Sequence, residues 1–180
     1  MGNEKTIMLK RILANLFLAV MVSVAHAASP SVQLHDLEGK PRNASEFIGH
    51  GKWVIVVVWA HDCRVCAEEI DEMSALHTAR SDSYVSVLGV SIDGREQLKA
   101  ARDFVSRHNL PFVNLVAEPE KELMMRFGGG PFIGTPTFYF YDPTGQIVAR
   151  NVGPTTRKEA ESLIDGFNAR ALAAQQPTQQ

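Results

Sequence analysis

The sequence has few cysteines, no strong excess of either charge and no apolar run of confident membrane-spanning length. Cys63 and Cys66 are the only two cysteines among its 180 residues, so no disulfide framework is expected to stabilise the chain. The formal net charge is −2, which indicates neither a nucleic-acid partner nor binding to an anionic membrane surface. Neither a repeat nor a second domain is found beyond the first residues, and the length predicts one domain.

The N-terminus has the pattern of a secretory signal peptide. Lys5, Lys10 and Arg11 precede an apolar stretch over residues 12–25, and a small-x-small cleavage site ends at Ala27. This order predicts a signal peptide over residues 1–27 and export to the periplasm, an oxidising compartment, with both cysteines in the mature chain. No cysteine sits at the cleavage site itself, so a lipid anchor is not indicated. The alternative is an uncleaved N-terminal membrane anchor.

Both cysteines lie where a buried strand leads into a helix. Residues 54–58 form an unbroken run of valine and isoleucine, which is typical of a strand buried on both faces. Helical spacing then follows at Cys66, Ile70, Met73 and Leu76. The helix N-terminus therefore falls at or near Cys63, where free N–H groups can lower the pKa of a thiol from about 8.5 to roughly 3.5–7.5. Cys63 is the candidate nucleophile, and Cys66 is the thiol that can resolve a mixed disulfide.

Two other roles for the cysteine pair stay open. A structural disulfide would restrict the unfolded chain by only ~2 kcal/mol, because the loop it closes is about four residues long. A metal site would need about four ligands, and only His61 lies close to Cys63 and Cys66 in the sequence. A copper or zinc carrier that uses these three residues is the hypothesis from a different class. The pattern itself contains no resident metal site and no cofactor motif.

Strands alternate with helices through the rest of the chain. Strands are expected at residues 31–35, 53–59, 84–92, 111–116, 137–141 and 146–151, and helices at 63–79, 95–108, 119–127 and 156–171. This order predicts an α/β domain over residues 28–174, with a mixed sheet covered by helices on both faces. Residues 175–180 are polar and are expected to be a disordered tail.

Several motifs together indicate a family. They are the lead-in at residues 34–40, Trp59-Ala60 before the two cysteines, residues 87–93, the segment 134–138 and the turn at 142–145. With these motifs the chain resembles the thioredoxin superfamily, and within it the exported TlpA/ResA-like thiol-disulfide oxidoreductases, from about Ser31 to Phe167. The resemblance implies a thioredoxin-like mixed sheet with an N-terminal extension and a central helical insertion at residues 95–108.

The resemblance also assigns residues that meet the client protein. It implies that the bond before Pro136 is cis and that the backbone of Thr135 lies beside Cys63, where an extended client segment can pair with it by strand addition. Trp59 is carried over as a further client-binding residue. The alternative for Pro136 is an ordinary turn proline at the start of a strand.

A proton acceptor for Cys66 is the remaining assignment. Thioredoxin carries a buried aspartate six residues before its first cysteine, whereas this chain has Val57 there. Glu69 matches a glutamate of the ResA-like branch that lies beneath the cysteine pair, and it is expected to take the Cys66 proton. The alternative for Glu69 is a solvated carboxylate on the helix surface, like Glu68.

The resemblance implies an exported protein that reduces disulfides in extracytoplasmic client proteins. It would work as a monomer without a cofactor or nucleic acid, and a DsbD-like or CcdA-like membrane protein would supply its electrons. A dithiol oxidase or an isomerase is the alternative within the same chemistry.

Overall fold

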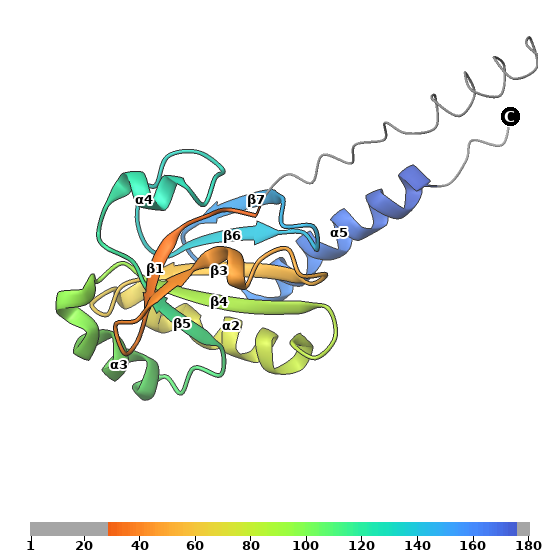
Figure 1. The fold of residues 1–180 in the computed structure, drawn as a ribbon. Coiled ribbons are helices and arrows are strands. Elements are labelled where there is room, and N and C mark those ends of the chain that lie inside the picture. Colours follow the sequence, from red (N-terminus) through yellow and green to blue (C-terminus); the bar gives the residue numbers. More distant parts are fainter. Residues whose placement is uncertain (1–28, 176–180) are drawn as a thin grey trace, which may run out of the picture.

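The computed structural model describes residues 29–175, whose backbone forms a seven-stranded mixed sheet with helices packed against it (Figure 1). The predicted signal peptide at residues 1–27 lies outside the described residues, and so does nearly all of the expected tail. Within the described range, no helix is both long enough and apolar enough to cross a membrane.

The sheet combines a parallel centre with antiparallel edges. Its strands are β1 (Gln33–Asp36), β2 (Pro41–Asn43), β3 (Trp53–Trp59), β4 (Val85–Ser91), β5 (Val113–Val116), β6 (Thr137–Tyr141) and β7 (Ile147–Val152). Their order across the sheet is β2-β1-β5-β4-β3-β6-β7. β3 and β5 both run parallel to β4, whereas β6 is antiparallel to β3 and β1 is antiparallel to β5. The predicted mixed sheet is confirmed.

Strand β3 lies near the middle of the sheet, and all seven of its residues are buried. Its side chains alternate between the two faces, so Ile55 and Val57 enter one core cluster and Val56 and Val58 enter the other. Burial on both faces explains why the sequence of β3 is a continuous apolar run and not an alternating one. The predicted bounds of this strand agree with the structure.

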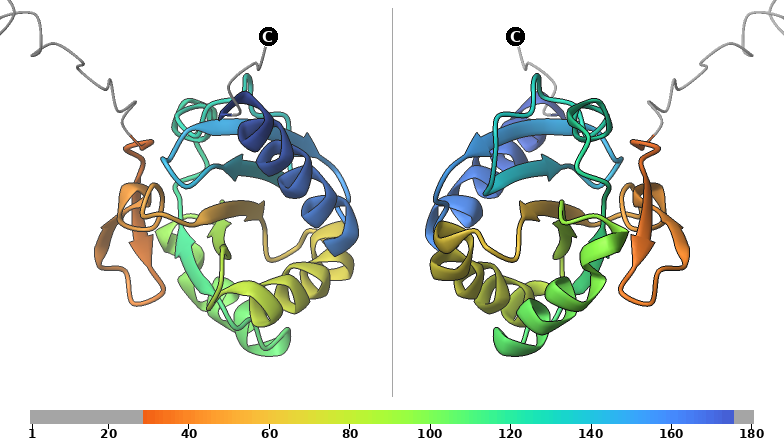
Figure 2. Two further views of the ribbon diagram at one scale, coloured as in Figure 1. Left: turned by 90° about the vertical axis from the view of Figure 1, so that its right-hand side faces the viewer. Right: turned by 90° about the vertical axis from the view of Figure 1, so that its left-hand side faces the viewer.

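Helices lie against both faces of the sheet, as predicted (Figure 2). The helices are α2 (Arg64–Arg80), α3 (Leu98–Arg107), α4 (Lys121–Met125) and α5 (Arg157–Gln175), and η1 (Ala44–Glu46) and η2 (Arg95–Gln97) are single 3-10 turns. Residues of α2, α3 and α5 share one core cluster, and residues of η1 and α4 join the other. The cysteine pair therefore begins a helix on the more heavily covered face.

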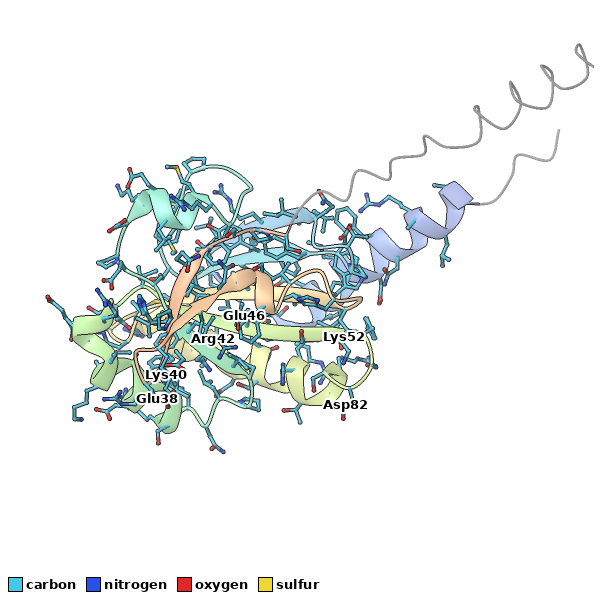
Figure 3. The ribbon with its side chains drawn as sticks, viewed as in Figure 1. Glu38, Lys40, Arg42, Glu46, Lys52 and Asp82 are labelled. Atoms are coloured by element: carbon cyan, nitrogen blue, oxygen red, sulfur yellow. A yellow bond between two sulfur atoms is a disulfide. The ribbon has the colours of Figure 1, made fainter. Side chains whose placement is uncertain are left out.

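The main differences from the predicted elements are local. The sequence pattern does not predict strand β2, because three residues starting with Pro41 are too few to show a period. Strand β2 leads directly into η1 through a capping box, in which the side chains of Asn43 and Glu46 each accept a hydrogen bond from the other residue's backbone. Arg42 pairs with Glu46 at 2.7 Å on this surface (Figure 3). The helix expected at residues 119–127 is only α4, since the N–H groups of residues 126–128 each bond to the carbonyl three residues back and not four.

Candidate redox site

The two cysteines lie at the junction of β3 and α2. β3 ends at Trp59, and the Cys63 N–H donates to the carbonyl of Ala60 at 3.1 Å to close a tight turn. Cys63 is the N-cap of α2, with extended backbone angles, and the helix begins at Arg64. The prediction that Cys63 starts the helix is confirmed.

Cys63 and Cys66 form a disulfide in this structure. Their surroundings differ, because Cys63 is half-buried at the rim whereas Cys66 is 1% exposed within the core. The backbone N–H of Cys66 also donates to Cys63 Sγ at 3.1 Å. In the reduced protein the same donor and the helix dipole would stabilise negative charge on Cys63. Cys63 is thus the accessible sulfur and Cys66 the protected one.

The segment with Pro136 lies at the same end of the sheet. Val58 of β3 pairs with Thr137 of antiparallel β6, so the residues before Thr137 run alongside those after Val58. The peptide bond between Thr135 and Pro136 is cis, as the resemblance implies. Thr137 Oγ1 donates to the carbonyl of Gly134 at 2.5 Å and ties the segment together. Thr135 precedes the ladder between β6 and its neighbours, so its backbone is outside the described sheet pairing.

Trp59 does not have the position that client binding would need. Its side chain is 0% exposed, and its ring stacks on Phe104 of α3 with centroids 4.4 Å apart. Trp59 Nε1 donates to Asn114 Oδ1 at 3.3 Å. The expectation that Trp59 contacts the client is therefore corrected, because this residue fills the core beneath the turn that carries Cys63.

The structure places Glu69 on α2, one turn after Cys66. Its side chain is half-buried and so more sheltered than the exposed Glu68, which pairs with Arg64 at 2.9 Å. Val57 is 1% exposed and shares a core cluster with Cys66, so this core position holds no carboxylate. Glu69 remains the proposed proton acceptor.

A histidine and an aspartate next to the cysteine pair form a hydrogen-bonded network. Asp93 follows β4, and its side chain is only 5% exposed. Its carboxylate accepts from the backbone N–H of His61 at 3.1 and 3.2 Å and lies 2.7 Å from His61 Nδ1. The hydroxyl of Ser91 donates to the same carboxylate. The network links the turn after β3 to the loop after β4.

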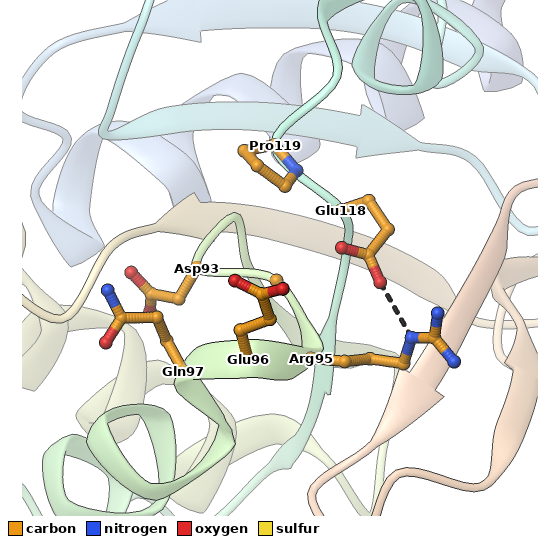
Figure 4. A pocket seen from close by; sticks show the side chains of 7 residues that line it. Asp93, Arg95, Glu96, Gln97, Glu118 and Pro119 are labelled. Carbon is orange, nitrogen blue, oxygen red and sulfur yellow. Dashed lines mark hydrogen bonds and ion pairs between the residues drawn. The ribbon is translucent and has the colours of Figure 1, made fainter.

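Asp93 also lines an open pocket of about 600 Å³. Glu96, Gln97 and Glu118 line it as well, and the guanidinium of Arg95 pairs with Glu118 at 2.8 Å (Figure 4). His61, Asp62 and Asp93 bring possible metal-ligand atoms within 4.8 Å of one another. Protein donors already occupy the Asp93 oxygens, so hydrogen bonding accounts for this cluster. The imidazole is directed at Asp93, and the cysteines are joined to each other, so His61, Cys63 and Cys66 do not form a ligand set here.

Asp93 is the site residue that sequence reasoning did not assign. Its place directly after a predicted strand could have identified it, because residues that follow neighbouring parallel strands meet at one edge of the sheet. β3 and β4 are parallel and pair Trp59 with Ser91, which places the residues after each strand side by side. The pairing of His61 with Asp93 follows from that register.

Comparison with known proteins agrees with this geometry. The family model described as "AhpC/TSA family" matches residues 25–150. The "Thiol-disulfide oxidoreductase ResA" of Bacillus cereus is 25% identical over 136 residues, covering 76% of this chain and 74% of that protein. The "Thiol:disulfide interchange protein DsbE homolog" of Paracoccus denitrificans is 28% identical over 147 residues, covering 82% of this chain and 76% of that protein.

Solved structures share the fold. The crystal structure of a thiol:disulfide interchange protein of the thioredoxin family from Chlorobium tepidum TLS superposes with a TM-score of 0.64 at 23% identity. The match covers 77% of this chain and 94% of that one. At this identity the likeness concerns the arrangement of strands and helices.

Proposed function

Because this chain belongs to the AhpC/TSA family, in its TlpA/ResA-like thioredoxin branch, we propose that it is an exported thiol-disulfide oxidoreductase that reduces disulfides in extracytoplasmic proteins. The observation that carries the proposal is the unequal exposure of the two cysteines. Cys63 caps a helix and is reachable from solvent, whereas Cys66 is buried one turn deeper. That asymmetry suits a pair in which one sulfur attacks and the other resolves.

The first step is attack by the Cys63 thiolate on one sulfur of a client disulfide. The client S–S bond breaks, a mixed disulfide forms between Cys63 and the client, and the other client sulfur leaves as a thiolate and takes up a proton. The Cys66 N–H and the helix dipole stabilise the attacking thiolate before the reaction.

The second step releases the reduced client. Cys66 loses its proton, for which we propose Glu69 as the acceptor, and attacks Cys63 Sγ. The mixed disulfide breaks, the disulfide between Cys63 and Cys66 forms, and the second client thiolate leaves and is protonated. Two electrons pass from the protein dithiol to the client, and no cofactor takes part.

The client would bind as an extended segment along the backbone of Thr135, next to the cis Pro136. The position of Thr135 outside the sheet ladder supports this, as does the nearby exposed side chain of Ile133, which is 71% exposed. Trp59 has no direct part in client binding.

Reduction in an oxidising compartment needs a supply of electrons. We propose a membrane electron donor of the DsbD-like or CcdA-like kind that reduces the disulfide after each cycle. The signal peptide at residues 1–27 would bring the protein to the periplasm, where it would act as a monomer.

The reduction potential of the cysteine pair tests the proposed direction. The protein is equilibrated with glutathione buffers, and its free thiols are alkylated and counted. We expect a value nearer to thioredoxin, about −270 mV, than to the oxidase DsbA, about −120 mV. The reduced protein should also reduce insulin. A potential near that of DsbA without insulin reduction would reassign the protein as an oxidase. Stoichiometric copper or zinc in the purified reduced protein would favour the carrier hypothesis instead.

A further inference from the structure

The proposed reaction names no protein donor for the proton that the first client thiolate takes up. When Cys63 attacks, the first client thiolate departs at the rim of the site, whereas Glu69 is assigned to the buried Cys66. His61 lies in the turn immediately before Cys63, and its side chain is 30% exposed. Two virtual bonds of about 3.8 Å separate the two Cα atoms, which are therefore at most about 7.6 Å apart.

The geometry settles which nitrogen of His61 can act. Nδ1 is 2.7 Å from Asp93 Oδ1, and a carboxylate can only accept, so Nδ1 carries a hydrogen and donates it. No hydrogen bond of Nε2 is found among the residues that the structure describes. Nε2 is thus the nitrogen left to exchange a proton with a bound client, and histidine does so within the physiological pH range.

Asp93 holds this arrangement by several contacts. It accepts from the imidazole, from the backbone N–H of His61 and from the hydroxyl of Ser91, and it is almost fully buried. The other charged group close to His61 is the exposed Asp62 of its own turn. Further charges lie around the pocket that Asp93 lines, namely Glu96 and the ion pair of Arg95 with Glu118 (Figure 4).

We propose that His61 is the general acid that protonates the first client thiolate and that Asp93 is its positioning residue. This inference rests on the proposed reductase function and deepens it. The imidazolium gives the Nε2 proton to the departing client sulfur as the bond between the two client sulfurs breaks and the bond to Cys63 forms. His61 becomes neutral and regains a proton from solvent before the next cycle.

A general acid and a purely electrostatic effect of His61 predict different rates with different disulfides. A general acid helps most when the leaving thiolate is strongly basic, as an alkyl thiolate is. An aromatic thiolate leaves readily without a proton. If His61 only tuned the thiolate of Cys63, both kinds of disulfide would be affected equally.

The experiment compares two substrates under single-turnover conditions with the reduced protein. One is bis(2-hydroxyethyl) disulfide, an alkyl disulfide, and the other is 5,5′-dithiobis(2-nitrobenzoic acid), an aromatic one. For His61→Gln we expect at least a tenfold slower reaction with the alkyl disulfide and a rate within twofold of wild type with the aromatic one. Equal slowing of both reactions, or no slowing of either, would overturn the inference.

Asp93→Asn tests the positioning role by the same ratio of alkyl to aromatic rates. The neutral amide removes the charge-assisted hydrogen bond that holds His61 Nδ1, so the alkyl reaction should slow at least threefold while the aromatic rate stays within twofold of wild type. An unchanged ratio would remove Asp93 from the proposal. His50→Gln is the matched control. His50 is exposed and lies before the start of β3, at the end of the strand opposite the cysteines, so the variant should keep the wild-type ratio of alkyl to aromatic rates.

Failure of the proposed reductase function would give a different result from failure of the role proposed for His61. A wild-type protein that reacts with the aromatic disulfide but is too oxidising to reduce insulin would contradict the reductase direction. The ratio of the two rates in His61→Gln relative to wild type would still report on His61.

Discussion

Gly89 of β4 lies opposite Asn114 of β5, and a Cβ atom at Gly89 would come within 1.9 Å of Asn114 Oδ1. That oxygen accepts the Trp59 Nε1 hydrogen, and Asn114 Nδ2 donates to the carbonyl of Phe112 at 2.8 Å. The missing side chain at Gly89 therefore makes room for a buried amide that satisfies Trp59 beneath the cysteine turn.

Gly89→Ala should lower the free energy of unfolding by about 1–3 kcal/mol, because Asn114 must move in a close-packed core. The urea midpoint of unfolding measures the change. Gly166→Ala in α5 is the matched control, since the nearest atom to an added Cβ is 4.0 Å away. It should stabilise the protein by about 0.5–1 kcal/mol through helix propensity. A Gly89→Ala variant as stable as wild type would contradict the close fit.

Cys66→Ala should trap mixed disulfides with client proteins, because it keeps the accessible nucleophile Cys63 and removes the resolving sulfur. Cys63→Ala should trap none, since Cys66 is only 1% exposed. Non-reducing electrophoresis of the variants after incubation with an oxidised client checks both. Equal trapping by the two variants would show that burial does not select the attacking cysteine.

Glu69→Gln should slow resolution of the mixed disulfide and leave the first attack little changed. The amide keeps the shape of the side chain but cannot take the Cys66 proton. Stopped-flow kinetics of the mixed disulfide between about pH 6 and 8 separate the two steps. Glu68→Gln is the matched control, because Glu68 is the neighbouring residue and its side chain is exposed; it should resolve the mixed disulfide at the wild-type rate. Resolution at the wild-type rate in Glu69→Gln would make the carboxylate a surface charge only.

The Thr135 amide should become protected from hydrogen exchange when a client is held in the Cys66→Ala mixed disulfide. Strand addition would engage that N–H in a backbone hydrogen bond, whereas a client held only by its sulfur would not. Amide exchange measured by NMR on the free and trapped protein tests this. Adding Thr135→Ala to the Cys66→Ala variant should leave the amount of trapped client unchanged, because the proposed contact uses the backbone of residue 135 and not its side chain. Unchanged exchange at Thr135 would place the client elsewhere.

His77 should make the fold less stable in acid. Its Nδ1 accepts a hydrogen bond from the Val87 N–H at 3.1 Å, and burial lowers its pKa, with nearby Asp82 raising it and Lys52 lowering it to smaller extents (Figure 3). The unfolded chain therefore binds the proton more readily. The stabilisation is complete above about pH 6.5 and is lost as pH falls through the lower folded value.

Urea unfolding between about pH 8 and 5 measures that loss. His77→Gln removes the titrating group and should flatten the decline in the urea midpoint over this range. His50→Gln, at an exposed histidine, should leave the decline as it is in wild type. An identical decline in wild type and His77→Gln would assign the acid sensitivity to other groups.

Local patterns predict most of the elements for identifiable reasons. β3 is predicted within its observed bounds because burial on both faces requires apolar residues at every position of its seven. The position of Cys63 at the N-terminus of α2 follows from helical spacing that begins at Cys66. Strand β2 escapes prediction because its three residues are too few for any period to show.

The sequence by itself determined where the cysteine pair lies, since a continuous apolar run followed by helical spacing from Cys66 predicts a buried strand that leads into a helix. Only the tertiary structure decided which groups surround them. Trp59 is buried because α3 closes over it, and Asp93 reaches His61 because parallel pairing brings the ends of β3 and β4 together. Such contacts join residues about 30–50 positions apart, and their partners depend on strand order and register, which no local pattern of residues specifies.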